Sequence, residues 1–203
     1  MSSLEHHPLE PFLPAKARIL FLGSFPPPQK RWSMDFYYPN FNNDHWRIEG
    51  EVFFHDRDYF VDVDARRFCR ERIVAFCEAQ GLAFYDTARV VRRLRDNASD
   101  AFLEVVEASD VRALLAALPY CRTVVTTGKK ATATLCAQLG ADKPPAVNAF
   151  VEFPGIVNAE NNAIELYRLP SSSRAYPMPI EKKAACYKAM FERYLTIEKE
   201  KKG

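Results

Sequence analysis

The sequence predicts a three-layer α/β/α fold built on a mainly parallel, four-stranded central sheet. Short, continuously apolar segments alternate with segments whose apolar residues recur at helical spacing, which is typical of strand–helix units. Glycine or proline follows most of these segments and separates them. No repeat, low-complexity block or Gly/Ser-rich linker interrupts the 203 residues, so we expect a single domain over residues 1–203.

The first half of the chain contains two predicted strands and one predicted helix. Residues 17–22 are continuously apolar after a basic start at Arg18, as expected of a strand that is buried on both faces. Residues 66–80 place apolar side chains on one helical face and end before Gly81, and residues 82–85 are apolar again. The aromatic and asparagine-rich residues 36–46 are expected to be irregular.

The second half of the chain repeats this alternation. Ser99 and Ser109 are suitable N-cap residues for two short helices. The remaining elements follow from apolar runs and from helical spacing of apolar residues. Strands are predicted at residues 123–126 and 163–169, and helices at residues 131–139 and from about Ile180 onward.

The ends of the predicted strands indicate where a functional crevice lies. In a parallel sheet, ligands bind beyond the carboxyl ends of the strands. Two loops have the most unusual composition: residues 23–28 end in three consecutive prolines, and residues 170–174 contain three consecutive serines. The rule selects four loops in total, at residues 23–28, 86–87, 127–128 and 170–174.

The composition argues against several function classes. A net charge of +2 and a pI near 8.2 are too mild to indicate nucleic-acid binding by themselves. The five cysteines include no CxxC pair, which disfavours a disulfide scaffold, a zinc site and an iron–sulfur cluster. We therefore expect no metal. The N-terminus is polar and no apolar run reaches the length of a membrane span, so a soluble, cytoplasmic monomer is expected.

Two common catalytic classes fit the sequence poorly. Ser24 follows a buried strand, but the GxSxG turn of serine hydrolases is missing and none of the four histidines falls near a late strand. Phosphate-binding glycine loops of the GxGxxG and GxxxxGK[ST] types are missing as well.

What remains at the strand ends is a set of amides, hydroxyls and aromatic rings. Flat rings stack on flat ligands, and an asparagine side chain offers a base edge both a donor and an acceptor. Such groups suit an extruded nucleobase, although the same residue types also commonly fill cores and turns. The set comprises Ser24, Phe25, Tyr37, Tyr38, Asn42, Asn43 and residues 171–173.

Four segments in a fixed order carry a family resemblance. They are residues 22–28 (LGSFPPP), residues 36–46 (FYYPNFNNDHW), residues 81–86 (GLAFYD) and residues 169–174 (LPSSSR). Together they resemble the motifs of the uracil-DNA glycosylase superfamily, and most closely those of its hypoxanthine-DNA glycosylase group. The resemblance spans nearly the whole chain and implies the fold of that superfamily.

The resemblance also implies an activity and the residues that perform it. It implies a monofunctional DNA glycosylase that hydrolyses the N-glycosidic bond of a deaminated base (hypoxanthine, uracil or xanthine) flipped out of DNA, with no cofactor. Asn43 takes the water-positioning or base-contacting role, because Phe25 stands where many members have Asn or Asp. Tyr38 is the implied stacking residue, and Ser24 joins Asn43 as catalytic. Further implied contacts are to the base from Phe25, Tyr37 and Asn42, and to DNA from Pro26, Ser171, Ser172, Ser173 and Arg174.

Two alternatives stay open at the level of sequence. The arginines at positions 89, 92, 93 and 95 can face a phosphate backbone or form the solvated side of an arginine-rich helix. Leu169 stands where the second motif often has His or Asn, so a non-catalytic nucleobase- or nucleic-acid-binding protein on the same fold is the alternative function. His45 is a candidate for electrostatic assistance in the reaction, but a lone histidine is more often a surface residue.

Overall fold

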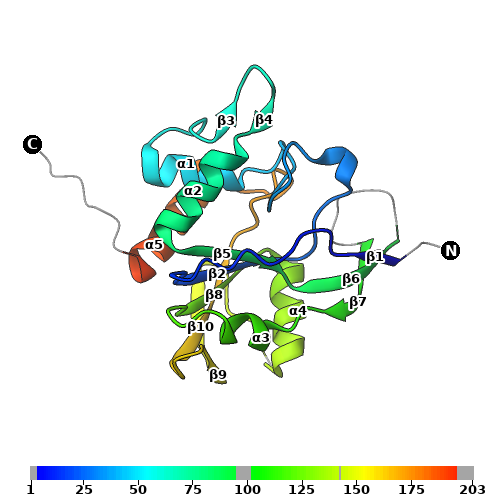
Figure 1. Cartoon of the computed structure of the whole chain (residues 1–203), viewed down its shortest axis with the longest axis vertical. Helices are drawn as coiled ribbons and strands as arrows, with labels where there is room; N and C mark the ends of the chain where they lie inside the picture. The colour runs from blue at the N-terminus through cyan, green and yellow to red at the C-terminus, as the bar shows by residue number, and fades with distance from the viewer. Residues whose placement is uncertain (1–3, 95–101, 142, 196–203) are drawn as a thin grey trace, which may run out of the picture.

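The computed structural model describes residues 4–94, 102–141 and 143–195, which form an α/β fold around a five-stranded sheet (Figure 1). Four strands of this sheet are parallel, and the fifth, at the edge, runs antiparallel to its neighbour. In spatial order the strands are β5 (Leu82–Asp86), β2 (Ile19–Gly23), β8 (Thr123–Thr127), β10 (Ala163–Leu169) and β9 (Ala149–Val157).

The expected four-stranded sheet is therefore a five-stranded mixed one. The additional strand, β9, contains Pro154 and Gly155, and both residue types are depleted in strands and hide its pattern. β9 sits at the edge of the sheet, where a proline is tolerated because one side of the strand has no ladder partner. The other four strands occupy the segments in which the sequence predicts them.

Helices lie on both sides of this sheet (Figure 1). Because helices cover both faces, every residue of β2, β5 and β8 is buried, and Ile19 to Leu22 of β2 are fully buried. On one side lie α1 (His45–Phe54), α2 (Arg70–Gln80) and α5 (Ile180–Tyr194), and on the other lie α3 (Val111–Ala116) and α4 (Lys129–Leu139).

The parallel register brings the carboxyl ends of four strands to one edge of the sheet. Gly23 of β2 pairs with Asp86 of β5, Leu22 pairs with Thr126 of β8, and Leu169 of β10 pairs with Thr127. The loops that leave these strands consequently start side by side, as the strand-end rule requires.

Two smaller sheets and a 3₁₀ turn, η1 (Gln29–Arg31), complete the secondary structure of the described residues. One small sheet is antiparallel and contains β1 (Leu4–His6), β6 (Ala88–Arg93) and β7 (Leu103–Ala108); the other pairs β3 (Val61–Asp62) with β4 (Arg67–Phe68).

The arginine-rich segment is a strand, so the interpretation as a helix is wrong. Strand β6 places its arginines beside acids of the neighbouring strands, with N–O distances of 3.1 Å for Arg89 to Glu107 and 2.8 Å for Arg92 to Glu104. Arg93 pairs with Glu5 of β1 at 3.0 Å. Arg95, the fourth arginine of the cluster, lies outside the described residues. These ion pairs compensate charges that the sequence alone leaves uncompensated.

The helix boundaries predicted from the sequence agree with the structure better at the C-terminal ends of the helices than at their N-terminal ends. Gly81 and Gly140 follow α2 and α4 with φ of 71° and 69°, the left-handed conformation that ends helices at glycine. Helix α2 starts at Arg70 rather than at residue 66. Asp110, not Ser109, caps α3 by accepting a hydrogen bond from the Ala113 amide; Ser99 lies outside the described residues.

None of the helices in the described part of the chain combines the length and the apolar character that crossing a membrane requires.

The glycines that end α2 and α4 give a stability prediction in which Gly140 serves as the control for Gly81. In Gly140→Ala the alanine must adopt the left-handed conformation, but its Cβ meets no atom within 4 Å. The backbone conformation alone should lower the unfolding free energy by about 1–2 kcal/mol. Gly81→Ala adds steric strain, because its new Cβ would lie 2.8 Å from the Lys16 carbonyl oxygen, so a total loss of about 2–4 kcal/mol is expected. Urea unfolding of both variants measures the difference, and equal losses would show that the Lys16 contact does not matter.

Candidate functional site

A cavity of about 540 Å³ opens at the carboxyl ends of the parallel strands. Its volume lies within the range of small-molecule sites in proteins. All four loops selected by the strand-end rule contribute to it, together with residues of the segment 36–46. The lining residues from these loops are Gly23 to Pro27, Asp86, Thr127 and Ser171 to Arg174, and those from the segment 36–46 are Tyr37 to Asn40, Asn42 and Asn43.

Three segments form most of the wall, and we name them by their composition. The proline loop is residues 22–28, the aromatic segment is residues 36–46, and the serine loop is residues 169–174. The structure brings together every residue that the sequence analysis assigns to the site, although the roles of these residues stay predictions.

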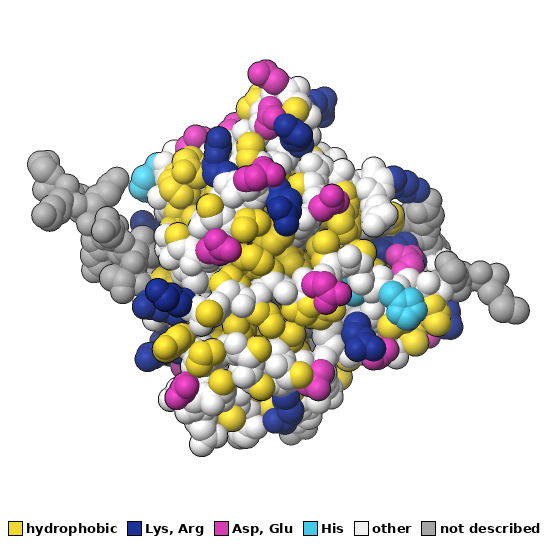
Figure 2. Space-filling view, viewed as in Figure 1, with side chains coloured by type: hydrophobic (Ala, Val, Ile, Leu, Met, Phe, Trp, Pro, Cys, Tyr) yellow, Lys and Arg dark blue, Asp and Glu magenta, His cyan; other side chains and the backbone are white. Residues whose placement is uncertain are grey.

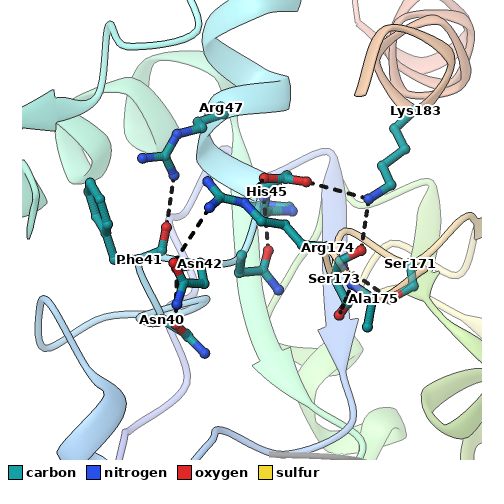
Figure 3. Close-up of polar contacts among 12 residues, drawn as sticks. Asn40, Phe41, Asn42, His45, Arg47, Ser171, Ser173, Arg174, Ala175 and Lys183 are labelled. Atoms are coloured by element: carbon teal, nitrogen blue, oxygen red, sulfur yellow. Dashed lines mark hydrogen bonds and ion pairs between the residues drawn. The ribbon is translucent and has the colours of Figure 1, made fainter. Parts of the chain in front are cut away.

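Asp44 joins the aromatic segment to the serine loop (Figure 3). Its backbone N–H donates to the Ser172 carbonyl at 3.0 Å, and its carboxylate accepts from Arg174 Nε at 2.8 Å. The second carboxylate oxygen lies 3.5 Å from Lys183 Nζ, which also donates to the Ser173 carbonyl at 2.8 Å. Asp44 is 7% exposed and Lys183 is 1% exposed. Two cations and one carboxylate therefore form a mostly buried network that fixes one side of the cavity.

The side chain of Asn43 has one end bound to the protein. Its Oδ1 accepts a hydrogen bond of 2.9 Å from the His45 backbone N–H at the start of α1. A β-bridge to Ser173 fixes its backbone against the serine loop. One of the two lone pairs of Oδ1 is committed to this bond, and Nδ2 carries two hydrogens, so the Nδ2 end of Asn43 can donate to a ligand.

Tyr38 presents one face of its ring to the interior of the protein. That face stacks on the imidazole of His45, with ring centroids 3.8 Å apart and planes inclined by 12°. Its hydroxyl and the Thr127 hydroxyl are hydrogen-bonded at 2.8 Å. The backbone at Tyr38 is left-handed, with φ of 51°, a conformation that is unfavourable for a non-glycine residue. Tyr38 also lines the cavity.

His45 is not at the surface, which corrects the expectation from sequence. Its side chain is fully buried, and its Nε2 lies 3.0 Å from Oε1 of the equally buried Glu49 one turn further along α1. The imidazole is therefore the support of the Tyr38 ring rather than a solvent-exposed group.

Hydrogen bonds hold the proline loop in place on its outer side. The Pro27 carbonyl accepts from Trp32 Nε1 at 2.7 Å, and the Pro26 carbonyl accepts from Arg93 Nη2 at 3.1 Å. The side chain of Phe25 packs against the small apolar cluster of the antiparallel sheet. Proline residues and these bonds together make the loop stiff, so its backbone groups have fixed positions at the cavity.

Three residues of the motifs are mostly buried, and this limits their roles. Tyr37 is 4% exposed and donates its hydroxyl to the Glu10 carbonyl, and burial raises the pKa of its phenol. Ser172 is 2% exposed, so little of its hydroxyl is left for a phosphate. Leu169, the first residue of the serine loop, is fully buried and packs in the core.

Sequence reasoning missed a carboxylate–imidazole pair at the floor of the cavity. Asp86 lines the cavity, and its Oδ2 lies 2.8 Å from Nε2 of His7, whose side chain is 1% exposed. Burial raises the pKa of Tyr85 next to it, and the negative charge of Asp86 adds to that effect. Asp86 was detectable as a lone acid ending an apolar strand, whereas His7 lies in a polar N-terminal segment that carries no signal.

Charge near the cavity is local rather than spread over a surface. On the face shown in Figure 2, cationic and acidic side chains are interspersed and form no continuous basic field. At the cavity itself, Arg31 is exposed and the Arg174 side chain is 48% exposed although its Nε pairs with Asp44. Cations positioned at the rim are suited to phosphate groups of a ligand that enters the cavity.

The five cysteines are free thiols, and burial raises the pKa of Cys121 to about 12. Among the described residues, no three His, Cys, Asp or Glu side chains are placed to hold a metal ion together.

Comparison with known proteins identifies the fold. No family model matches the chain, and no curated protein sequence matches it. Among solved structures, the chain is similar to the solution NMR structure of a "putative Uracil DNA glycosylase" from Methanosarcina acetivorans, with a TM-score of 0.59 and 20% sequence identity. The likeness covers 95% of this chain and 99% of the other. This chain therefore shares the fold of that solved structure, in agreement with the fold that the motifs predict, whereas the hypoxanthine branch stays a prediction.

The network around Asp44 gives a second stability prediction. Lys183→Met removes a buried cation and leaves the Ser173 carbonyl without its Nζ donor, so we expect unfolding free energy to fall by about 2–4 kcal/mol. Lys182→Met changes the exposed neighbour on the same helix and should alter stability by less than about 0.5 kcal/mol. Urea unfolding compares the two variants, and a Lys183→Met protein as stable as the Lys182→Met protein would contradict the assigned role.

Proposed function

We propose that this protein is a monofunctional DNA glycosylase that hydrolyses the N-glycosidic bond of hypoxanthine, uracil or xanthine flipped out of DNA. The observation that carries the proposal is the convergence of the proline loop, the aromatic segment and the serine loop on one cavity of about 540 Å³. The fold shared with a solved structure that bears a glycosylase name supports it. Enzymes that act on a base inside DNA need such a pocket for the extruded nucleotide.

The reaction places clear demands on the site. Water adds its oxygen to C1′ as the bond between C1′ and the base nitrogen breaks, the base leaves with the bonding electron pair, and a proton from the water completes the free base. The transition state resembles an oxocarbenium sugar next to an increasingly negative base. Catalysis therefore requires a stacked base and fixed donors aimed at that developing charge.

The chain supplies groups of both kinds. Tyr38 lines the cavity and can stack on a base there, and the His45 imidazole supports its ring from the protein side. Asn43 can donate from Nδ2 to a carbonyl oxygen of the leaving base, since its Oδ1 accepts from the His45 amide. Of the two roles that the resemblance leaves to Asn43, this arrangement favours base contact over water positioning.

The serine loop has free hydroxyl protons for the DNA backbone. Ser171 Oγ accepts from the Ser173 amide at 3.2 Å, and Ser173 Oγ accepts from the Ala175 amide at 3.2 Å. Because both oxygens are used as acceptors, the hydroxyl hydrogens can donate to phosphate oxygens. Arg174 adds a half-exposed cation beside them. We expect the protein to contact DNA through this loop and to act as a monomer.

One assay tests the function against its alternative, a non-catalytic binder of nucleobases or nucleic acid. Duplex and single-stranded oligonucleotides that carry one hypoxanthine, uracil or xanthine are incubated with the protein and then treated with alkali, which cleaves abasic sites. Strand cleavage at the lesion is the expected result. If none of the three lesions gives product while the oligonucleotides still bind, the binding alternative replaces the proposal.

Two substitutions of Asn43 then separate its possible roles. Asn43→Ala removes both ends of the amide and should lower the single-turnover rate by about 100-fold or more. Asn43→Asp keeps an acceptor for the His45 amide but replaces the donor by a negative charge, so it should lose at least as much activity. Circular dichroism verifies folding. An Asn43→Asp protein with near wild-type rates would mean that Asn43 positions water or only caps the helix.

A further inference from the structure

His45 and Glu49 form a pair of ionisable side chains in the core next to the cavity. Neither side chain is exposed, and His45 Nε2 lies 3.0 Å from Glu49 Oε1, one turn further along α1. Among the described residues, His45 is the one basic side chain that forms an ion pair with this carboxylate. Because neither residue lines the cavity, an effect of the pair on a bound ligand must pass through another residue.

The burial of this pair is unfavourable for stability. Both imidazole nitrogens and both carboxylate oxygens have no hydrogen-bond partner among the described residues, so the 3.0 Å contact is held by charge. The neighbouring groups Tyr187 and Cys77 add no compensating charge, because burial raises the pKa of each and keeps them neutral at neutral pH. Replacing a buried ion pair by apolar side chains is often neutral or stabilising. An apolar pair would avoid this cost, which indicates a role other than stability.

The contact between His45 and Tyr38 has the geometry expected of a cation on an aromatic face. The ring centroids are 3.8 Å apart and the planes are inclined by 12°. Two neutral aromatic rings disfavour such a close face-to-face arrangement and prefer offset or edge-on contacts with centroids about 4.5–7 Å apart. A positive charge, in contrast, is attracted to the negative face of a tyrosine ring. Phe21 and Phe84 pack against the same imidazole at 84° and 88°, and these apolar surroundings strengthen the attraction.

The backbone of His45 holds the other side chain that the proposed reaction uses. Its N–H donates to Asn43 Oδ1 at 2.9 Å at the start of α1. One residue therefore contacts Tyr38 through its imidazole and Asn43 through its amide. Because Glu49 lies one turn further along the same helix, its attraction to Nε2 fixes the rotamer of His45 and with it the plane against which the Tyr38 ring packs.

We propose that His45 and Glu49 are positioning residues of the glycosylase site, and that they form an imidazolium–carboxylate pair whose positive ring holds Tyr38 by a cation–π contact. This role rests on the proposed function, because it explains how the stacking residue of that site is kept in place. Glu49 stabilises the proton on the imidazole, and Tyr38, which lines the cavity, transmits the effect to a bound base. His45 thus acts through Tyr38 and not by direct electrostatic assistance.

Replacement of the whole pair separates positioning from stability. The double variant His45→Phe/Glu49→Leu keeps a flat ring at position 45 but removes both charges, so its midpoint of urea unfolding should equal or exceed that of the wild-type protein. Its single-turnover rate on a cleavable lesion should nevertheless fall at least about tenfold, because a neutral ring prefers an offset arrangement and lets Tyr38 move. A double variant that is as stable and as fast as the wild-type protein would overturn the inference.

Glu49→Gln removes the charge with little change of shape and serves if the double variant does not fold. It should lower the rate at least about threefold in the wild-type protein but by less than about 1.5-fold in a Tyr38→Leu protein, where the ring that it acts through is missing. Equal losses in the two backgrounds, or no loss in either, would contradict the assigned role. Glu51→Gln changes a partly exposed carboxylate of the same helix and should leave both rates unaltered.

Histidine NMR tests the pair without any cleavage step. Imidazolium and neutral imidazole differ in the shifts of their ring nitrogens, and His45→Phe identifies the signal of His45 among the four histidines. Near neutral pH, His45 should be an imidazolium in the wild-type protein and neutral in Glu49→Gln. A cationic His45 that depends on Glu49, in a protein that cleaves no lesion, would retain the pair as the anchor of Tyr38 and reject the glycosylase activity. Cleavage by a protein whose His45 is neutral would reject the inference and retain the activity.

Discussion

The arrangement of the cavity depends on the buried carboxylate of Asp44. Burying this charge is unfavourable unless partners compensate it, and here Arg174 and Lys183 come from segments 130 and 139 positions away in the chain. The network thereby links the start of α1, the serine loop and the first turns of α5 at one point (Figure 3). The main effect of the network is to fix the relative positions of these segments. The charges of its members compensate one another only when all three segments are in place.

The second constraint is the sheet itself. Since β2, β5 and β8 are buried on both faces, their register cannot slip without exposing apolar residues or burying polar ones, and the positions of Gly23, Asp86 and Thr127 are fixed with them. The stiff proline loop extends this rigidity beyond the strand end. The floor of the cavity is thus determined by the core, while its walls are determined by the Asp44 network.

How far the sequence predicts this structure depends on the range of the interactions involved. Helix ends at Gly81 and Gly140 and the buried strand before Gly23 follow from local patterns, and the fold that the motif segments predict agrees with a solved structure. The interpretation of β6 as a helix was wrong because the acids that pair with its arginines lie on β1 and β7, outside the segment itself. The sequence analysis did not predict the His7–Asp86 pair, because its two residues are distant in the sequence. It did not predict the burial of His45, because that burial results from tertiary packing.

The polar groups of the cavity share a property that distinguishes them from core and surface groups. Asn43, Tyr38 and Asp86 each have one hydrogen-bonding or stacking side committed to the protein, through the His45 amide, the His45 ring and the His7 imidazole respectively. These contacts fix the orientation of the three side chains, so little reorganisation is needed when a ligand arrives. Preorganised groups are what transition-state stabilisation requires, and this feature of the cavity supports the proposed enzyme over a passive binder.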